Sequence, residues 1–339
     1  MAKQVITAEM SAAEQIALSQ SNKAKHEASL KRRRIISNII VYILLAVMCI
    51  IWLLPIAWLV LASFNADGLA GMTQLVPQSW GIYNYQDLFM NQVYDVGTKQ
   101  LLPSSFVFFL RVKPNGAVTL GSIIYTFIIA VLTSLISTLF VMATSYAFSR
   151  LRFKSRAAMM RIILLLGMFP GFLGIIVLYQ IFNMWKMLNS IWTLVIIYSG
   201  GAGMGYYISK GFFDTISKQI DEAAMIDGAT RFQIFYKITL PLAKPIIVYQ
   251  ILTSFMGPWA EFITSSYILG SPKNYNLGQV VTVAPQLNDM LSLDDGGMRA
   301  KYWGQFCAGA VIVAIPTSIL FLILQRNYVG GVTGGAVKG

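Results

Sequence analysis

The chain has 339 residues, of which 56% are hydrophobic and only 12% are charged. Soluble domains carry about 25% charged residues, so this composition excludes an ordinary soluble domain and indicates a membrane protein. The net charge of +12 does not point to nucleic acid as a partner. The basic residues lie beside apolar segments instead, as membrane topology requires.

The residue counts also exclude several kinds of catalytic site. His26 is the only histidine, so this chain alone cannot build a histidine-based triad or a two-histidine metal site. Cys49 and Cys307 lie in apolar segments without the spacing of a metal site, and we interpret them as small core residues. The sequence has no GxxxxGK[ST] loop for phosphates. We therefore expect neither enzymatic activity nor a cofactor bound by this chain.

Residues 1–34 form a polar tail that ends in the basic run Lys31–Arg34. We expect this tail to be solvated; the alternative is a contact of its weakly amphipathic part with the membrane or a partner. The apolar run at residues 35–63 can cross about 30 Å of hydrocarbon. It predicts a retained first transmembrane helix, kinked at Pro55, rather than a cleaved signal peptide.

Residues 64–121 are too long for a simple turn and contain turn formers, aromatic residues and an apolar patch too short to span. We expect a small cap outside the membrane there, without predicting its fold. Residues 122–325 are predicted to form the core of the protein. Its transmembrane helices are expected at residues 122–148, 161–182, 188–209, 246–269 and 306–324.

The basic residues orient these helices. Most of the 26 lysines and arginines lie on the side of the N-terminal tail, which the positive-inside rule assigns to the cytoplasm. Both termini, including the C-terminal tail 326–339, are therefore expected in the cytoplasm. The sequence thus predicts an all-α, multi-pass membrane protein with about six transmembrane helices in contact with lipid.

Residues 222–241, which read EAAMIDGATRFQIFYKITLP, lie on the cytoplasmic side between two apolar segments and are helix-prone. Ala223 and Ala224 are expected to leave one face of a first helix flat. Gly228 allows a tight break that a residue with a Cβ would resist. The pattern predicts a structured hairpin that fits a socket on another protein.

The second half of this segment carries start and stop signals for another helix. Thr230 followed by Gln233 has the spacing of a capping box, so a second helix should start at once. Leu240–Pro241 should end it, because the residue before proline is pushed away from helical angles.

Residues 270–303 form the second long external segment. We expect it to reach toward a water-borne partner, and a flexible solvated loop is the alternative. Its polar residues and glycines include Asn274, Asn276, Asp289, Asp294, Asp295, Gly296 and Gly297.

Several motifs resemble one known family. The pattern E-A-A-x-x-D-G-A, an aromatic-rich spacer and I-x-L-P at residues 222–241 resembles the EAA loop of ATP-binding-cassette (ABC) importer permeases, the binding-protein-dependent, MetI-like family. Residues 146–153 (YAFSRLRF), the segment around 168–170 and the terminal QRNYVGGVTGGAVKG resemble its MalG-like branch for maltose and maltodextrin. The resemblance is poorest in the first external segment.

The resemblance implies a type I ABC importer fold and a transport subunit without its own ATPase site. Its partners would be a larger MalF-like permease subunit, two ABC ATPase subunits at the cytoplasmic face that bind ATP and Mg, and an extracytoplasmic solute-binding protein that delivers the sugar. The location would be the cytoplasmic membrane of a bacterium or archaeon. ATPase-coupling residues transferred from the EAA loop are Glu222, Ala223, Ala224, Asp227, Gly228, Ala229, Phe232, Leu240 and Pro241.

Two further contacts follow from the same branch. Its C-terminal tail reaches the ATPase dimer, so residues 325–339 would form a second cytoplasmic contact. A loop between its last two helices probes the cleft of the binding protein, a role that residues 270–303 would take here.

Each residue of the EAA loop can be given a physical task. Glu222 would pair with a donor at the rim of the socket, and a structural helix cap is the alternative. Asp227 would cap the helix break. Ala229, Phe232 and Phe235 would pack the hairpin or fill the socket, and internal packing is the favoured interpretation for the two phenylalanines.

The substrate site is less visible in the sequence. Glu261 is an ionisable residue within a predicted span and is a functional candidate by default, with an interfacial position at a helix end as the alternative. Tyr198 and Trp259 could stack on sugar rings, although such aromatics commonly form interfacial belts. The glycines at 200, 201, 203 and 205 are interpreted as sites of close helix packing rather than as the lining of a pathway.

The sequence thus predicts a permease subunit that moves a carbohydrate, most directly an oligosaccharide such as maltodextrin, by alternating access. A permease for glycerol phosphate, amino acids or phosphate is the nearest alternative. An ion-coupled secondary transporter is more distant, because it needs ionisable residues within several spans.

Overall fold

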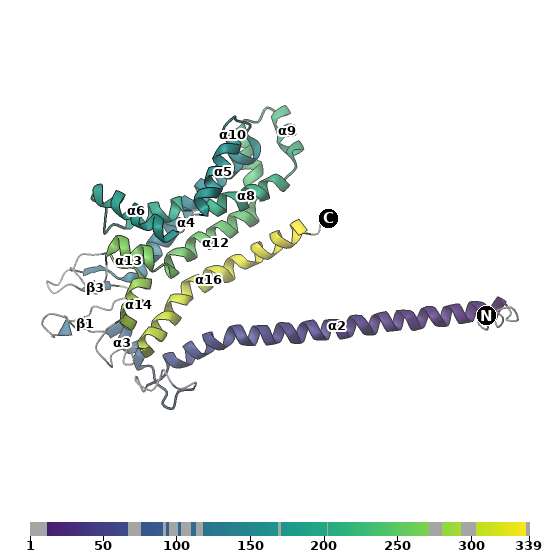
Figure 1. Ribbon diagram of the computed structural model, residues 1–339, viewed down its shortest axis with the longest axis horizontal. Coiled ribbons are helices and arrows are strands. Elements are labelled where there is room, and N and C mark those ends of the chain that lie inside the picture. Colours follow the sequence, from purple (N-terminus) through teal and green to yellow (C-terminus); the bar gives the residue numbers. More distant parts are fainter. Residues whose placement is uncertain are drawn as a thin grey trace. The chain divides into compact units, whose positions relative to one another are not determined.

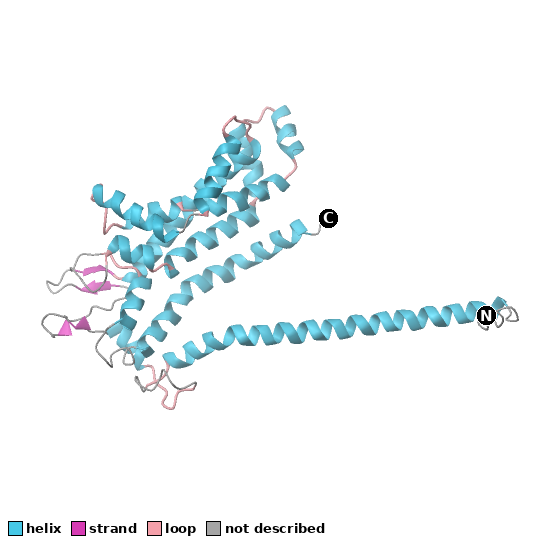
Figure 2. Cartoon of the chain, in the orientation of Figure 1, coloured by secondary structure: helices cyan, strands magenta, loops and turns pink. Residues whose placement is uncertain are grey.

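The computed structural model divides into two compact units, residues 1–59 and 60–339. It describes residues 12–66, 76–90, 93–94, 101–102, 110–112, 118–168, 171–201, 203–270, 280–292 and 303–336. Within these ranges the chain is helical apart from two short antiparallel hairpins (Figure 2). In these, β1 (Val93–Tyr94) pairs with β2 (Leu101–Leu102) and β3 (Leu110–Val112) pairs with β4 (Val118–Leu120). The predicted all-α class is confirmed.

The first unit is the greater part of helix α2 (Ala12–Ser63). Ser29–Ser63 is long and apolar enough to cross a membrane, which agrees with the predicted first span. The helix begins well before that span and runs through the basic segment Lys31–Arg34 and through Pro55. The predicted polar tail is therefore helical from Ala12 onward.

The second unit contains the remaining helices (Figure 1). The two longest are α4 (Ser122–Arg150) and α16 (Trp303–Ala336). The others are α3 (Tyr83–Met90), α5 (Arg156–Gly167), α6 (Gly171–Met184), α7 (Ile191–Gly200), α8 (Gly203–Thr215), α9 (Lys218–Ile226), α10 (Arg231–Gln233), the π-helix η3 (Ile234–Thr239), α11 (Leu240–Leu242), α12 (Lys244–Ala260), α13 (Ile263–Leu269) and α14 (Val283–Ser292).

Several predicted spans are interrupted. Among the described residues, 3 helices are long and apolar enough to cross a membrane, and two bent helix pairs bring the candidates up to 5. The predicted span at residues 161–182 is divided between α5 and α6. The span at residues 188–209 bends by 46° between α7 and α8, and the span at residues 246–269 is broken between α12 and α13. Gly or Pro lies in the sequence at or just before each interruption, and these residues weaken a helix interior by about 1 and 3 kcal/mol, respectively.

Helix α3 ties the segment that follows α2 to the helical core. Asn84 Nδ2 donates to the backbone carbonyls of Ser63 and Asn65 at 2.9 and 2.8 Å. Gly304, near the start of α16, approaches Asn84 so closely that a Cβ there would lie 2.5 Å from its side chain. Helix α3 is therefore packed against α16.

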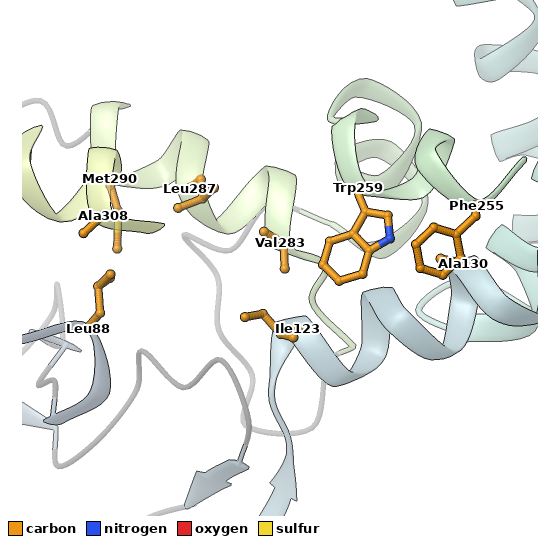
Figure 3. Packing of buried hydrophobic residues seen from close by; sticks show 9 residues of the cluster. All are labelled: Leu88, Ile123, Ala130, Phe255, Trp259, Val283, Leu287, Met290 and Ala308. Carbon is orange, nitrogen blue, oxygen red and sulfur yellow. The ribbon is translucent and has the colours of Figure 1, made fainter. Parts of the chain in front are cut away.

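A buried apolar cluster fixes α14 against α4, α12 and α16 (Figure 3). The rings of Phe255 and Trp259 lie 6.0 Å apart on α12. The full cluster is Leu88, Ile123, Ala130, Phe255, Trp259, Val283, Leu287, Met290 and Ala308. Because α14 contributes three of these buried side chains, the flexible-loop alternative is wrong for residues 283–292. The predicted polar positions 274, 276 and 294–297 lie outside the described residues.

Candidate functional site

The segment predicted as a hairpin folds as one, and we refer to residues 218–242 as the hairpin. Helix α9 ends at a tight turn in which Gly228 has a φ of 84°. The Gly228 N–H donates to Met225 O at 3.1 Å and the Ala229 N–H donates to Ala224 O at 2.9 Å. These two bonds form a Schellman motif, whose left-handed position glycine occupies without steric cost. The predicted break at Gly228 is confirmed.

The second arm starts with the predicted capping box. The Thr230 N–H donates to Gln233 Oε1 at 2.8 Å, and the Gln233 N–H donates to Thr230 Oγ1 at 3.3 Å. Each side chain therefore satisfies an amide that the first helical turn leaves free. From here α10, η3 and α11 form one helical arm, Arg231–Leu242.

The predicted stop at Leu240–Pro241 is correct to within one residue, but its predicted reason is wrong, because Leu240 keeps helical angles. The arm continues to Leu242, and the chain then bends by 80° into α12. In η3 the Leu240 N–H donates to Phe235 O, one residue further back than in an α-helix. This wider π-helical turn accommodates the ring of Pro241, which would clash with a carbonyl in a regular α-helix.

The tip of the hairpin is apolar and exposed. The side chains of Ile226 and Phe232 are 87% and 71% exposed, and the Phe232 ring lies 5.5 Å from that of Tyr236. The internal-packing interpretation is therefore wrong for Phe232. It is confirmed for Phe235, whose ring centroid lies 4.8 Å from that of Tyr146.

The two alanines of the motif do not form one outward face. Glu222 and Ala223 are exposed, whereas Ala224 is buried. Neighbouring positions of an α-helix differ by about 100°, which separates adjacent side chains. Asp227 occupies the predicted C-cap position, where its N–H donates to Ala223 O at 3.1 Å.

A buried ion pair attaches α9 to the end of α4. Asp221 Oδ2 lies 3.1 Å from Arg150 Nε, and the Arg150 and Asp221 side chains are only 2% and 7% exposed. Arg150 Nη2 also donates to Ile216 O at 2.8 Å, just before α9 begins. Neither charged residue is among those predicted to couple. In the sequence, each of the two opposite charges lies next to an apolar segment, and this is the signal from which the pair could have been predicted.

The same end of α4 also contacts the second arm. Tyr146 packs against Phe235 of η3 and lies edge-on to Phe213 of α8, with centroids 6.3 Å apart. Its hydroxyl lies 3.5 Å from Arg231 O, at the start of the arm. Residues 146–150 of α4 therefore contact both arms of the hairpin, which lies at one end of the second unit (Figure 1).

A pocket of about 280 Å³ is lined by α4, α7, α8 and α12, together with Glu261 that follows α12. Most of its exposed lining is apolar, and we call it the polar pocket for the hydroxyl, amide and carboxyl groups that reach it. Gly201 and Gly205 are part of its wall, the position that the alternative interpretation of these glycines stated. Glu261 is the single charged residue of the lining. The polar side chains there are those of Thr133, Ser137, Tyr198, Tyr249, Gln250, Thr253, Ser254 and Glu261.

Two of the three predicted substrate residues meet in this pocket. Tyr198 Oη donates to Glu261 Oε2 at 3.3 Å. The same Glu261 oxygen accepts the Thr264 N–H at 2.8 Å and so caps the start of α13. Glu261 therefore lies at a helix end, which is the alternative position predicted for it from the sequence. Trp259 is buried in the cluster of Figure 3 and does not line the pocket.

A buried hydrogen-bond network joins the pocket walls. Gln250 Nε2 of α12 donates to Ser137 Oγ of α4 at 3.1 Å and to Ser254 Oγ at 2.7 Å. Such a network fixes α4 against α12, because breaking it would leave polar groups unpaired in a low-dielectric interior.

The chemistry of the lining is that of hydroxyl, amide and carboxylate groups without a lysine, arginine or histidine. It can exchange hydrogen bonds with a neutral polar solute. An anion would find no positive partner there and would meet the carboxyl group of Glu261.

Comparison with known proteins agrees with this architecture. A family model described as "Binding-protein-dependent transport system inner membrane component" matches residues 140–333. The match contains the hairpin, Arg150 and most of the pocket lining.

Individual relatives match over nearly the whole chain. The galactooligosaccharides transport system permease protein GanQ of Bacillus subtilis (strain 168) is 35% identical over 313 residues, which cover 92% of this chain and 99% of the relative. The maltodextrin transport system permease protein MalD of Streptococcus pneumoniae is 29% identical over 312 residues, with the same coverage of 92% and 99%.

A solved structure shares the fold. It is the crystal structure of a bacterial ABC transporter involved in the import of the acidic polysaccharide alginate, matched with a TM-score of 0.62. The sequences are 20% identical, and the match covers 86% of this chain and 96% of the other.

Proposed function

Because the chain belongs to the family of binding-protein-dependent transport system inner membrane components, we propose that it is a permease subunit of an ATP-driven importer for a neutral oligosaccharide. Such a subunit makes and breaks no covalent bond. It provides part of a pathway that opens to either side of the membrane in turn, as two packed arrangements of the same helices allow.

The observation that carries this proposal is the hairpin. Its tip, Ile226 and Phe232, is exposed, while its base is fixed by the buried Asp221. An exposed apolar pair on a fixed base is suited to insertion into a cleft of another protein. That protein would be a cytoplasmic ATPase subunit, and Glu222 would pair with a donor at the rim of its cleft. ATP and Mg²⁺ would bind to two such subunits and not to this chain.

The polar pocket supports a neutral sugar as the solute. Its hydroxyl and amide groups match the hydroxyls of a sugar, and Tyr198 adds an aromatic face beside Glu261. Glycerol phosphate, phosphate and the carboxylate of an amino acid fit less well, because the lining offers them no positive charge. The names of two relatives specify galactooligosaccharides and maltodextrin, which supports an oligosaccharide.

The remaining partners follow from the family. A second, MalF-like permease subunit would complete the pathway, and a solute-binding protein outside the membrane would deliver the sugar. Residues 270–303, which include α14, would contact that binding protein. The termini and the hairpin would lie in the cytoplasm, where residues 325–339 would provide a second contact with the ATPase.

The proposal is tested by purifying the chain with its neighbours and reconstituting the complex in lipid vesicles. We expect an ATPase and a second permease to co-purify, and ATP to drive uptake of the sugar that the cognate binding protein retains. Uptake driven by an ion gradient without ATP would contradict the proposal and favour a secondary transporter. If the binding protein retains a phosphorylated solute, this would contradict the proposal of a neutral sugar but not that of an ATP-driven importer.

Glu222→Lys tests the role of the hairpin in the same assay. The reversed charge should leave the protein in the membrane and reduce both ATPase association and sugar uptake, because Glu222 is exposed and holds no part of the fold together. Normal uptake by this variant at normal expression would remove the coupling role of the hairpin.

A further inference from the structure

Helix α4 makes contacts with three functional regions of the second unit. At its end, Arg150 is paired with Asp221 of the hairpin at 3.1 Å. In its middle, Ser137 is hydrogen-bonded to Gln250 in the wall of the polar pocket. Near its start, Thr126 Oγ1 accepts the Val283 N–H, the first amide of α14, at 3.0 Å.

The spacing of these contacts makes α4 a long connector. An α-helix rises 1.5 Å per residue, so Thr126 and Arg150 are separated by about 36 Å along one uninterrupted helix. Figure 1 shows the hairpin and α14 toward opposite ends of the second unit. The neighbouring pathway segments α7/α8 and α12/α13 are broken, and α4 is not.

The Arg150–Asp221 pair has the features of a positional contact. A buried ion pair gives little net stability compared with apolar residues of the same size, because desolvation opposes the attraction. It does fix two elements in one register, since each charge has its partner in one place. Arg150 also holds Ile216 O, so the start of α9 has little freedom relative to α4.

We propose that Arg150 and Asp221 are the positioning pair that transmits movement of the hairpin to α4, and through α4 to the polar pocket and α14. This inference rests on the proposed function. When the ATPase subunits displace the hairpin, the ion pair obliges the end of α4 to follow. Without it the hairpin still docks and Tyr146 still contacts the second arm, but α9 is no longer held on α4 and less of the movement reaches the pocket.

The experiment uses the full complex in lipid vesicles and measures sugar taken up per ATP hydrolysed. The variants are Arg150→Asp, Asp221→Arg, the double exchange of both charges, and Asp221→Asn, which removes the charge while keeping the shape. Lys210→Gln is the matched control. It breaks an ion pair at 2.5 Å between two residues of α8 and leaves the hydrogen bond from Ser149 Oγ of α4 to Asp214 Oδ1 in place.

We expect each single variant to retain the ATPase and to lose about tenfold or more of its uptake per ATP, because a charge without its partner no longer holds α4 in register with the hairpin. The double exchange should recover a large part of the ratio, and the Lys210→Gln control should keep it. A reduced stability alone would lower the amount of complex and leave the ratio unchanged. If the charge-reversed proteins do not accumulate in the membrane, the uptake per ATP is measured with Asp221→Asn instead.

Three results would overturn the inference: an unchanged ratio in the single variants, loss of ATPase binding in those variants, or no recovery in the double exchange. The second would assign the pair to building the docking surface, and the third would assign the effect to the separate side chains. Failure of the unmodified complex to take up sugar would instead refute the proposed function.

Discussion

The hairpin and the polar pocket differ in how they are stabilised. In the hairpin, local bonds close the Gly228 turn and the Thr230 cap, and a buried ion pair holds α9 on α4. The pocket is lined by the continuous helix α4 and by α7, α8 and α12, which belong to the two bent helix pairs, and side chains from distant parts of the sequence connect them. The hairpin is thus held by bonds between near neighbours and by one ion pair, whereas the pocket is built from segments that are distant in sequence. The following predictions test that difference, beginning with the largest expected effect.

The largest effect is expected at the turn of the hairpin. Gly228→Pro places a residue locked at φ near −65° where φ is 84°, and it removes the N–H that donates to Met225 O. The cost should reach about 3 kcal/mol or more, so ATPase association and uptake should be abolished while the protein stays in the membrane. Co-purification and uptake at equal membrane amounts measure this.

Gly228→Asn is the matched control for that turn. Asparagine tolerates the left-handed region, so this variant should retain most of its uptake. Equal uptake by the proline and asparagine variants would mean that the turn geometry has no part in coupling.

The next largest effect is expected at the exposed tip. Ile226→Ser and Phe232→Ser each remove an apolar side chain whose burial in a partner would contribute about 1.5–3 kcal/mol. ATPase affinity should fall by about one to two orders of magnitude, since every 1.4 kcal/mol is tenfold. The unfolding temperature of the isolated subunit should not change, because both side chains are exposed.

Met184→Ser, with a side chain 80% exposed on α6, is the control for the tip. Binding of the ATPase, measured by titration in detergent, should be as in the unmodified chain. A loss of thermal stability in the tip variants would show that these side chains support the fold rather than the contact.

A smaller effect is expected in the pocket. Tyr198→Phe removes a hydroxyl that bonds Glu261, a contribution of about 0.5–1.5 kcal/mol. The KM for sugar uptake should rise several-fold while ATPase binding remains unchanged. Trp259→Phe should leave KM unaltered, because Trp259 lies outside the pocket. A change of KM in the Trp259 variant with none in the Tyr198 variant would place the pathway elsewhere.

The smallest effect is expected for Thr230→Ala, which removes half of the capping box. Loss of such a cap costs about 1 kcal/mol, so ATPase affinity should fall no more than about fivefold. Thr230→Ser retains the accepting oxygen and should behave as the unmodified chain. If serine fails to rescue, the methyl group rather than the hydrogen bond is what matters.

The sequence predicted the hairpin well because its geometry depends on neighbours. Gly228, Thr230 and Gln233 act within a few residues of one another, and their spacing alone specifies the turn and the cap. The helical angles of Leu240 before Pro241 were mispredicted because η3 widens the preceding turn, a change that no local rule at proline includes.

The pocket and the ion pair could not be predicted in the same way. Arg150 and Asp221 come from segments far apart in the chain, and only the packing of α4 against the hairpin brings them together. The helix breaks did have a sequence signal in the glycines near 200 and in Pro258, yet apolar composition alone favoured continuous spans. The sequence alone gave no reason to prefer Tyr198 or Trp259 as a substrate residue. In the structure Trp259 is buried, whereas Tyr198 lines the pocket.

The interrupted helices have a further consequence for the biogenesis of this subunit. Non-helical backbone is tolerated at membrane depth only where protein covers it or water fills a cavity. Pro258 has no backbone N–H to donate to the carbonyl of Ser254, and both residues line the pocket. A newly inserted chain without a second permease subunit would expose the polar groups of this pocket wall to lipid. We therefore expect an orphan subunit to be short-lived, so that the cell retains it only once it is assembled.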